Sequence, residues 1–214
     1  MKRYAPFLAA IALCFTGVPL HATTLLSENF DELSQQLTVT SVGAFSTIDG
    51  TNVDVVGTPG QFATLIVSPE SGNAVDMGGS GGNYQGILQS NSNFLLVPGE
   101  TYDLSFDLVG SQRGTTSSTT VTFGSYDHTF VLDSTDQAGT GGLVNVLVTV
   151  SSPQSSYLTF TDNTSTTDIG SLLDNVTLTE TTNSPVPEPS SLLLLGSGLA
   201  TLAGGLWKRR KIGA

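Results

Sequence analysis

The sequence predicts an all-β domain, an antiparallel jelly-roll sandwich, between two apolar ends of the chain. Apolar residues in the middle of the chain alternate with polar ones in steps of two, which is the period of a half-buried strand. Glycine, proline, asparagine and serine separate these runs, as they do at turns. Helical spacing is not sustained anywhere in residues 23–180. Eight or more short strands without helices favour a two-layer sandwich, because each sheet must bury one face.

The clearest strand is Thr101–Val109, in which four apolar side chains alternate with polar ones after a Pro98-Gly99 turn. The run Leu143–Val150 is apolar at most positions on both faces, so we expect a more central strand there. Five further runs of the same character are predicted strands, at residues 62–67, 119–123, 126–132, 157–160 and 172–179.

The N-terminal 22 residues have the pattern of a secretory signal peptide. Lys2 and Arg3 precede an apolar run of residues 5–18, and a short segment ending in Ala22 follows it. Such a run is too short to span a membrane and is typical of a signal cleaved at a small residue, here after Ala22. The alternative is a buried N-terminal helix. Cleavage would remove Cys14, the only cysteine, so we expect no disulfide in the exported domain.

The charges are segregated along the chain. Residues 23–187 hold 17 of the 18 acidic residues, all except Glu188, and one basic residue, Arg113, so their formal charge is −16. Nucleic acids and anionic lipid headgroups repel such a domain, and divalent cations are attracted to it. We therefore expect no nucleic-acid partner.

The C-terminal segment has the composition of a single transmembrane helix. Residues 190–207 carry no charge, and a helix of 18 residues is about 27 Å long, close to the roughly 30 Å of a hydrocarbon core. A stop-transfer cluster follows directly, and the positive-inside rule keeps it, with the rest of the tail at 208–214, in the cytoplasm. The cluster is Lys208, Arg209, Arg210 and Lys211. This predicts a β domain outside the inner membrane.

A proline-rich linker at residues 181–189 joins the domain to this helix and ends in Val186, Pro187, Glu188 and Pro189. Prolines exclude a helix there and leave an extended peptide. The order Val-Pro-Glu-Pro, glycine-containing apolar helix and basic cluster resembles the PEP-CTERM sorting signal. That resemblance implies a partner, an exosortase, which removes the anchor in exopolysaccharide-producing Gram-negative bacteria. The alternative is an ordinary single-pass anchor on a proline-rich stalk.

The middle domain resembles the galactose-binding-like jelly rolls of choice-of-anchor surface domains. Four segments carry this second resemblance, at residues 28–31, 72–77, 97–108 and 173–178. They are mostly structural, so they indicate a fold more than an activity. The tryptophans usual in sugar-binding members are missing, since Trp207 lies in the predicted anchor.

Tyr84 is a candidate for binding a carbohydrate, since sugar rings pack on aromatic faces. It follows a glycine-rich run, Gly78–Asn83, that predicts a flexible loop. Arg113, the sole cation of the domain, is a second candidate ligand contact. The alternatives are a plain turn at Tyr84 and a solvated loop residue at Arg113.

Asp174 is expected to face inward, because strict alternation places it on the face of Leu172, Val176 and Leu178. An inward carboxylate needs partners. Backbone N–H groups are one possibility; the other is a structural Ca²⁺, which prefers oxygen ligands. The ligands would be Glu28, Asp31 and Asp174, with Asp162 and Asp168 as further oxygen donors.

The sequence offers little for catalysis, although its many carboxylates leave an enzyme as the third and least favoured class. The domain has no cysteine nucleophile, no lysine and no Gly-x-Ser-x-Gly turn, and its only histidine, His128, alternates with Tyr126 and Phe130 as a strand residue does. The sequence favours a non-catalytic protein of the cell surface or exopolysaccharide matrix, exported and transiently anchored. The alternative is a carbohydrate-binding module of that surface, with polysaccharide as its partner.

Overall fold

The computed structural model describes residues 21–57, 72–111, 113, 115–134, 142–164 and 168–182. One compact unit, His21–Thr182, contains all of them. The predicted strand at 62–67, the first 20 residues and the predicted linker, membrane helix and basic tail from residue 183 onward lie outside the described residues.

Every regular element that the structure describes is a β-strand. The strands are β1 (His21–Glu28), β2 (Gln36–Val39), β3 (Ser41–Val42), β4 (Phe45–Thr47), β5 (Val53–Gly57), β6 (Asn73–Asp76), β7 (Ile87–Ser90), β8 (Phe94–Leu96), β9 (Thr101–Val109), β10 (Ser117–Phe123), β11 (Tyr126–Leu132), β12 (Leu143–Val148), β13 (Gln154–Ser156), β14 (Thr159–Asp162) and β15 (Leu172–Thr182).

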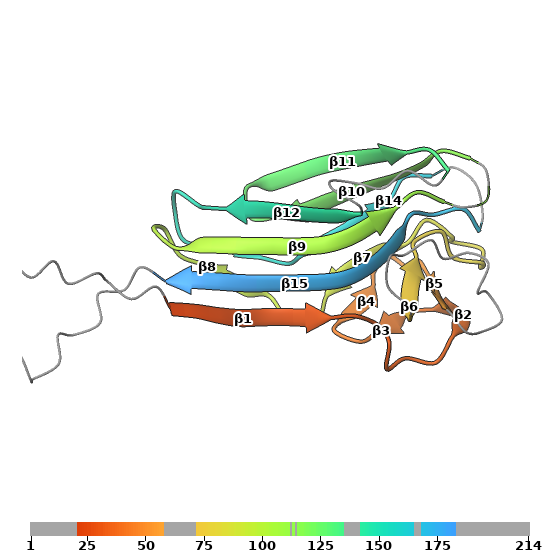
Figure 1. The fold of residues 1–214 in the computed structure, drawn as a ribbon, viewed down its shortest axis with the longest axis horizontal. Coiled ribbons are helices and arrows are strands. Elements are labelled where there is room, and N and C mark those ends of the chain that lie inside the picture. The colour runs from red at the N-terminus through yellow and green to blue at the C-terminus, as the bar shows by residue number, and fades with distance from the viewer. Residues whose placement is uncertain are drawn as a thin grey trace, which may run out of the picture. The chain divides into compact units, whose positions relative to one another are not determined.

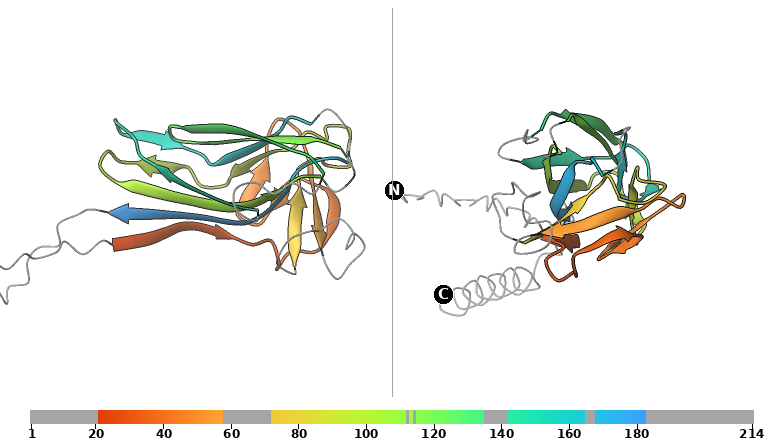
Figure 2. Two further views of the ribbon diagram at one scale, coloured as in Figure 1. Left: turned by 45° about the horizontal axis from the view of Figure 1, so that its top comes forward. Right: turned by 90° about the vertical axis from the view of Figure 1, so that its right-hand side faces the viewer.

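The strands form two main antiparallel sheets (Figures 1 and 2). A seven-stranded sheet has the order β12-β9-β15-β6-β5-β2, with β1 also paired to β15. A six-stranded sheet has the order β11-β10-β14-β7-β4-β3, and β8 and β13 form a small third sheet. The predicted all-β antiparallel sandwich is confirmed.

Aromatic side chains fill the space between the two sheets. Phe106 of β9 is fully buried and meets two residues of the other sheet edge-on, Phe160 at 5.3 Å and Phe130 at 5.9 Å between ring centroids. Phe45 continues the cluster, 6.0 Å from Phe160. Buried Tyr102 satisfies its hydroxyl by donating to Glu180 Oε1 at 3.1 Å. One aromatic core therefore ties both sheets together.

The period-two pattern located six of the fifteen described strands, β9 to β12, β14 and β15, and missed β1 to β8 and β13. β9 and β11 have the predicted bounds, and β10, β14 and β15 differ from their predicted ranges by a few residues. The prediction of a central strand at Leu143–Val150 was wrong, because β12 ends the seven-stranded sheet. Its valines at 144 and 148 face the core, whereas Leu143 and Leu147 on the other face remain exposed.

The chain enters and leaves the domain at the same place. β1 and β15 run antiparallel, and His21 lies opposite Thr182 in their register (Figure 1). The predicted cleavage after Ala22 falls inside β1, so it would remove the two residues that pair with Thr182 and Thr181. β15 begins at the opposite end of the sandwich, roughly 35 Å away for 11 residues at about 3.3 Å each.

Candidate functional site

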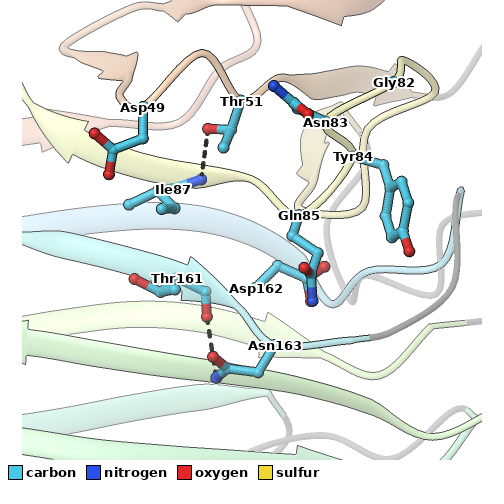
Figure 3. A pocket seen from close by; sticks show the side chains of 10 residues that line it. All are labelled: Asp49, Thr51, Gly82, Asn83, Tyr84, Gln85, Ile87, Thr161, Asp162 and Asn163. Carbon is cyan, nitrogen blue, oxygen red and sulfur yellow. Dashed lines mark hydrogen bonds between the residues drawn. The ribbon is translucent and has the colours of Figure 1, made fainter.

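A pocket of about 470 Å³ opens toward the end of the sandwich where β15 begins (Figure 3). Three segments surround it: the turn before β5, the segment leading into β7, and the end of β14. The lining residues are Asp49, Thr51, Gly82, Asn83, Tyr84, Gln85, Ile87, Thr161, Asp162 and Asn163. Amides, hydroxyls and carboxyls dominate this lining, and it contains no lysine, arginine or histidine.

Hydrogen bonds hold the glycine-rich segment that shapes one wall of the pocket, and the flexibility expected for this segment stays a prediction. Asp54 accepts from both the N–H and the hydroxyl of Ser80, and Asn52 Oδ1 accepts from the N–H of Gly81 at 3.2 Å. A Cβ at Gly79 would collide with Asn52, so glycine is required there for close packing. These contacts join the segment to Asn52 and to Asp54 of β5.

Tyr84 and its neighbours lie on this wall. The N–H of Gly79 donates to the carbonyl of Tyr84 at 2.8 Å, and Asn52 Nδ2 donates to the carbonyl of Asn83 at 3.0 Å. Gln85 Nε2 donates to the carbonyl of Thr164 at 2.8 Å, which connects the wall to the segment after β14. Tyr84 is half-buried and lines the pocket, and its predicted contact with a carbohydrate stays a prediction.

Asp162 is the buried carboxyl of the pocket lining. Its Oδ1 accepts from the hydroxyl of Thr164 at 2.6 Å and from the N–H of Thr164 at 3.1 Å, whereas Oδ2 is buried without a partner among the described residues. Thr119, directly opposite on β10, also has a buried hydroxyl without a partner there. Burial raises the pKa of Asp162 to about 7, although the bonds from Thr164 oppose this.

Asp76 at the end of β6 is a second buried carboxyl near this end of the sandwich. Burial raises its pKa to about 7, against the opposing effects of the Gly78 N–H and of Arg113. The structure therefore places Arg113 near Asp76, as an exposed residue that does not line the pocket. Tyr84 and Arg113 are not brought together in one pocket.

Glu28 and Asp31 fix loops through backbone groups. Glu28 Oε2 accepts from the N–H of Ala44 at 2.8 Å and Oε1 from that of Phe30 at 3.0 Å. Asp31 Oδ1 accepts from the N–H of Asn73 at 2.8 Å. Each carboxylate thus joins segments that are distant in sequence.

Asp174 does not share a face with Val176 and Leu178 as predicted. A β-bulge falls between Asp174 and Thr177, with Asn175 at a positive φ of 50°. One extra residue reverses the alternation, so Leu173, Val176 and Leu178 reach the main core. Asp174 lies opposite Asp107 on the other face, and its Oδ1 accepts from the N–H of Asn175 at 2.7 Å.

No group of three or more His, Cys, Asp or Glu side chains suited to a metal ion occurs in the described ranges. Calcium binding by Glu28, Asp31 and Asp174 stays a prediction. It would be excluded by a melting temperature that neither EDTA nor added calcium changes.

One signal for the pocket is present in the sequence. Asp162 and Phe160 have the same parity on β14, and both are buried. An inward carboxylate at the end of a strand therefore marks this site. Asp49, Asn83 and Asn163 come from turns, and which turns meet in space depends on the sheet order.

The sorting motif Val186–Pro189 and the stop-transfer cluster Lys208–Lys211 lie outside the described residues. In the part of the chain that the structure describes, there is no helix of the length and apolarity needed to cross a membrane.

Comparison with known proteins identifies the tail. A family model described as the PEP-CTERM protein-sorting motif matches residues 185–211. None of the curated proteins is significantly similar to this chain.

Several solved structures share a distant likeness with the β domain. One is the K1 cleaved adhesin domain of Lys-gingipain from Porphyromonas gingivalis (18% identity, TM-score 0.44, 73% of this chain and 97% of that chain). Another is the CBM22-1 xylan-binding domain of Xyn10C from Paenibacillus barcinonensis (15% identity, TM-score 0.39, 73% and 94%). A third is the arabinose-bound α-L-arabinofuranosidase MgGH51 (15% identity, TM-score 0.47, 74% of this chain), of which this chain spans only 27%.

The matched segment contains the Val-Pro-Glu-Pro peptide, the uncharged run and the basic cluster in the order that the sequence predicted. The chain therefore carries a PEP-CTERM protein-sorting motif, which implies an exported surface protein that is anchored in the membrane and then processed by an exosortase.

Proposed function

We propose that this chain is a non-catalytic protein of a Gram-negative cell surface or exopolysaccharide matrix, delivered there by its sorting tail. The observation that carries the proposal is the match of the sorting motif to residues 185–211. A formal charge of −16 in residues 23–187 supports it, because such a domain stays soluble and is repelled by anionic headgroups.

The pocket chemistry supports a non-catalytic role. Its lining contains two carboxyl groups, Asp49 and Asp162, and no histidine, cysteine or lysine. Oδ1 of Asp162 accepts a hydrogen bond from the hydroxyl of Thr164, and Oδ2 is buried. A general acid has to reach the substrate atom that it protonates. The buried carboxyl of Asp162 does not offer its oxygens to a substrate in this way.

Replacing Pro187, Glu188 and Pro189 together by alanine should abolish removal of the tail in a host that contains the exosortase. The extended peptide offered to the enzyme is then lost, while residues 190–211 remain as an anchor. The mass of the mature protein, measured by mass spectrometry, checks this. Ser184→Ala is the control, and an unchanged mature mass in the triple variant would refute the sorting role.

A second candidate function is carbohydrate binding in the Tyr84 pocket. The pocket offers a half-buried aromatic ring beside the amides of Asn83, Gln85 and Asn163, in a wall fixed by hydrogen bonds. A flat ring with amide groups at its edge suits a sugar ring and its hydroxyls. The lining carries carboxyls and no cation, so a neutral sugar fits better than a uronate.

Tyr84→Ala should weaken glycan binding by about tenfold or more, since an aromatic contact contributes on the order of 1–2 kcal/mol. Glycan arrays followed by calorimetry on the fragment 21–182 measure this. Tyr157→Ala is the matched control, because Tyr157 is 41% exposed and lies outside the pocket. An array without any binding would eliminate this function and leave the surface role intact.

A further inference from the structure

β12 leaves one side of its backbone open. Among the described strands it pairs only with β9, at the end of the seven-stranded sheet (Figure 1). The N–H of Leu108 in β9 donates to the carbonyl of Gly142 at 2.9 Å, and the register continues without a shift to Val148. Since backbone groups alternate in direction along a strand, those of residues 143, 145 and 147 point away from β9. No hydrogen bond between described residues uses them.

β12 also lacks the features that protect other sheet edges from pairing. β11 carries the charged Asp127 near its start, β3 has two residues, and β1 and β2 both have a register shift. β12 has the sequence Leu-Val-Asn-Val-Leu-Val, without charge, proline or bulge. Edges of this kind are templates for another strand.

The side chains on the outer face of β12 are unusually apolar for an exposed strand. Leu147 is 66% exposed and Leu143 is 49% exposed. Asn145 lies between them, and its Nδ2 donates to Asp103 Oδ1 at 3.0 Å. The outer face of β12 therefore consists of two exposed leucines with one asparagine between them.

We propose that β12 is the docking edge for a second copy of this chain, paired antiparallel about Asn145. In this register Leu143 of one copy lies opposite Leu147 of the other, Val144 lies opposite Val146, and Asn145 lies opposite itself. Every apolar residue of this central segment then meets an apolar residue, and the free backbone groups of residues 143, 145 and 147 pair with each other. A two-fold axis requires such self-complementarity, and the sequence of β12 supplies it.

The charge of the domain sets how this dimer responds to salt. Both copies are strongly acidic, so they repel each other, while the proposed contact contains no ion pair. Salt screens the repulsion, so added salt tightens this dimer. Added salt would instead weaken a dimer whose interface was built on ion pairs. A six-residue strand pair is a small interface, and we expect a dissociation constant on the order of micromolar.

Sedimentation equilibrium of the fragment His21–Thr182, the compact unit that holds the whole described core, tests this proposal. We expect a monomer–dimer equilibrium that tightens with NaCl. Leu147→Lys should weaken it at least tenfold. Val131→Lys should leave it unchanged, because Val131 is equally exposed, at 65%, on the edge strand β11, and the change adds the same charge. Both substitutions lie on the surface, so both variants should stay folded.

A cross-link locates the two-fold axis. Asn145→Cys introduces the only cysteine of this fragment, and two copies would lie about 5.5 Å apart between Cα atoms, within disulfide range. We expect a disulfide-linked dimer from Asn145→Cys and none from the control Thr129→Cys on β11. The proposal is overturned if the fragment is monomeric throughout, if Val131→Lys weakens the dimer as much as Leu147→Lys, or if the two cysteine variants cross-link equally.

Discussion

Phe106→Ala should lower the free energy of unfolding of the β domain by about 3–5 kcal/mol. The ring is fully buried and is the contact through which β9 meets both Phe160 and Phe130 of the opposite sheet. Its removal leaves a cavity between two sheets that cannot close without shifting whole strands. Because a domain of this size is typically stable by only about 5–15 kcal/mol, this variant should be close to unfolding.

Urea denaturation of the fragment 21–182 measures this loss. Leu95→Ala is the control, since that side chain is 65% exposed and its truncation should change stability by no more than about 0.5 kcal/mol. A cost below about 1 kcal/mol for Phe106→Ala would contradict the description of one shared core.

The β domain should be less stable at pH 8 than at pH 5. Burial raises the pKa of both Asp76 and Asp162 from 3.8 to about 7. The unfolded chain therefore releases these two protons at lower pH than the folded chain does. Stability falls as the pH rises from about 4 through 7, because ionising these carboxyls in the folded domain leaves buried charge away from water.

Asp162→Asn should flatten this pH dependence and stabilise the domain at pH 8 by on the order of 2 kcal/mol. The asparagine Oδ1 can accept the same two hydrogen bonds from Thr164. Its Nδ2 takes the place of Oδ2 and can donate to the hydroxyl of Thr119 on the neighbouring strand, which has no partner among the described residues. Melting temperatures from pH 5 to 8 measure the change. Asp127→Asn removes the same charge from an exposed site on β11 and is the control. Equal pH profiles for the two variants would refute the role of burial.

Alternation predicted the longer strands of the second half of the domain, because each of them obeys it locally, and it missed the short strands β2 to β8 and β13 as well as β1. It placed β9 and β11 at their observed bounds and identified Phe106 and Tyr102 as inward-facing. It failed at Asp174, where the bulge at Asn175 adds one residue and exchanges the faces. Nothing in the local pattern of residues 172–178 marks that extra residue.

Sheet order is a non-local property, and the sequence pattern did not supply it. The apolar residues on both faces of Leu143–Val148 suggested a central strand, yet β12 is an edge with two exposed leucines. The same limit applies to the pocket. Tyr84 was recognised by its chemistry, whereas Asp49 and Asn163 join it only because β4, β7 and β14 are neighbours in one sheet.

The pocket and the point of attachment lie at opposite ends of the sandwich, because β15 runs the length between them. A domain attached through Thr182 thus presents its pocket away from the end that carries the tail. The arrangement would suit either proposed function, a matrix component or a carbohydrate-binding protein.

The most direct test of the surface role is to fractionate cells with and without the exosortase and determine the size and location of the protein. We expect a shortened protein outside the inner membrane when the enzyme is present, and a full-length protein held in the membrane with its β domain facing outward when it is absent. A β domain found in the cytosol of the native cell would contradict the account.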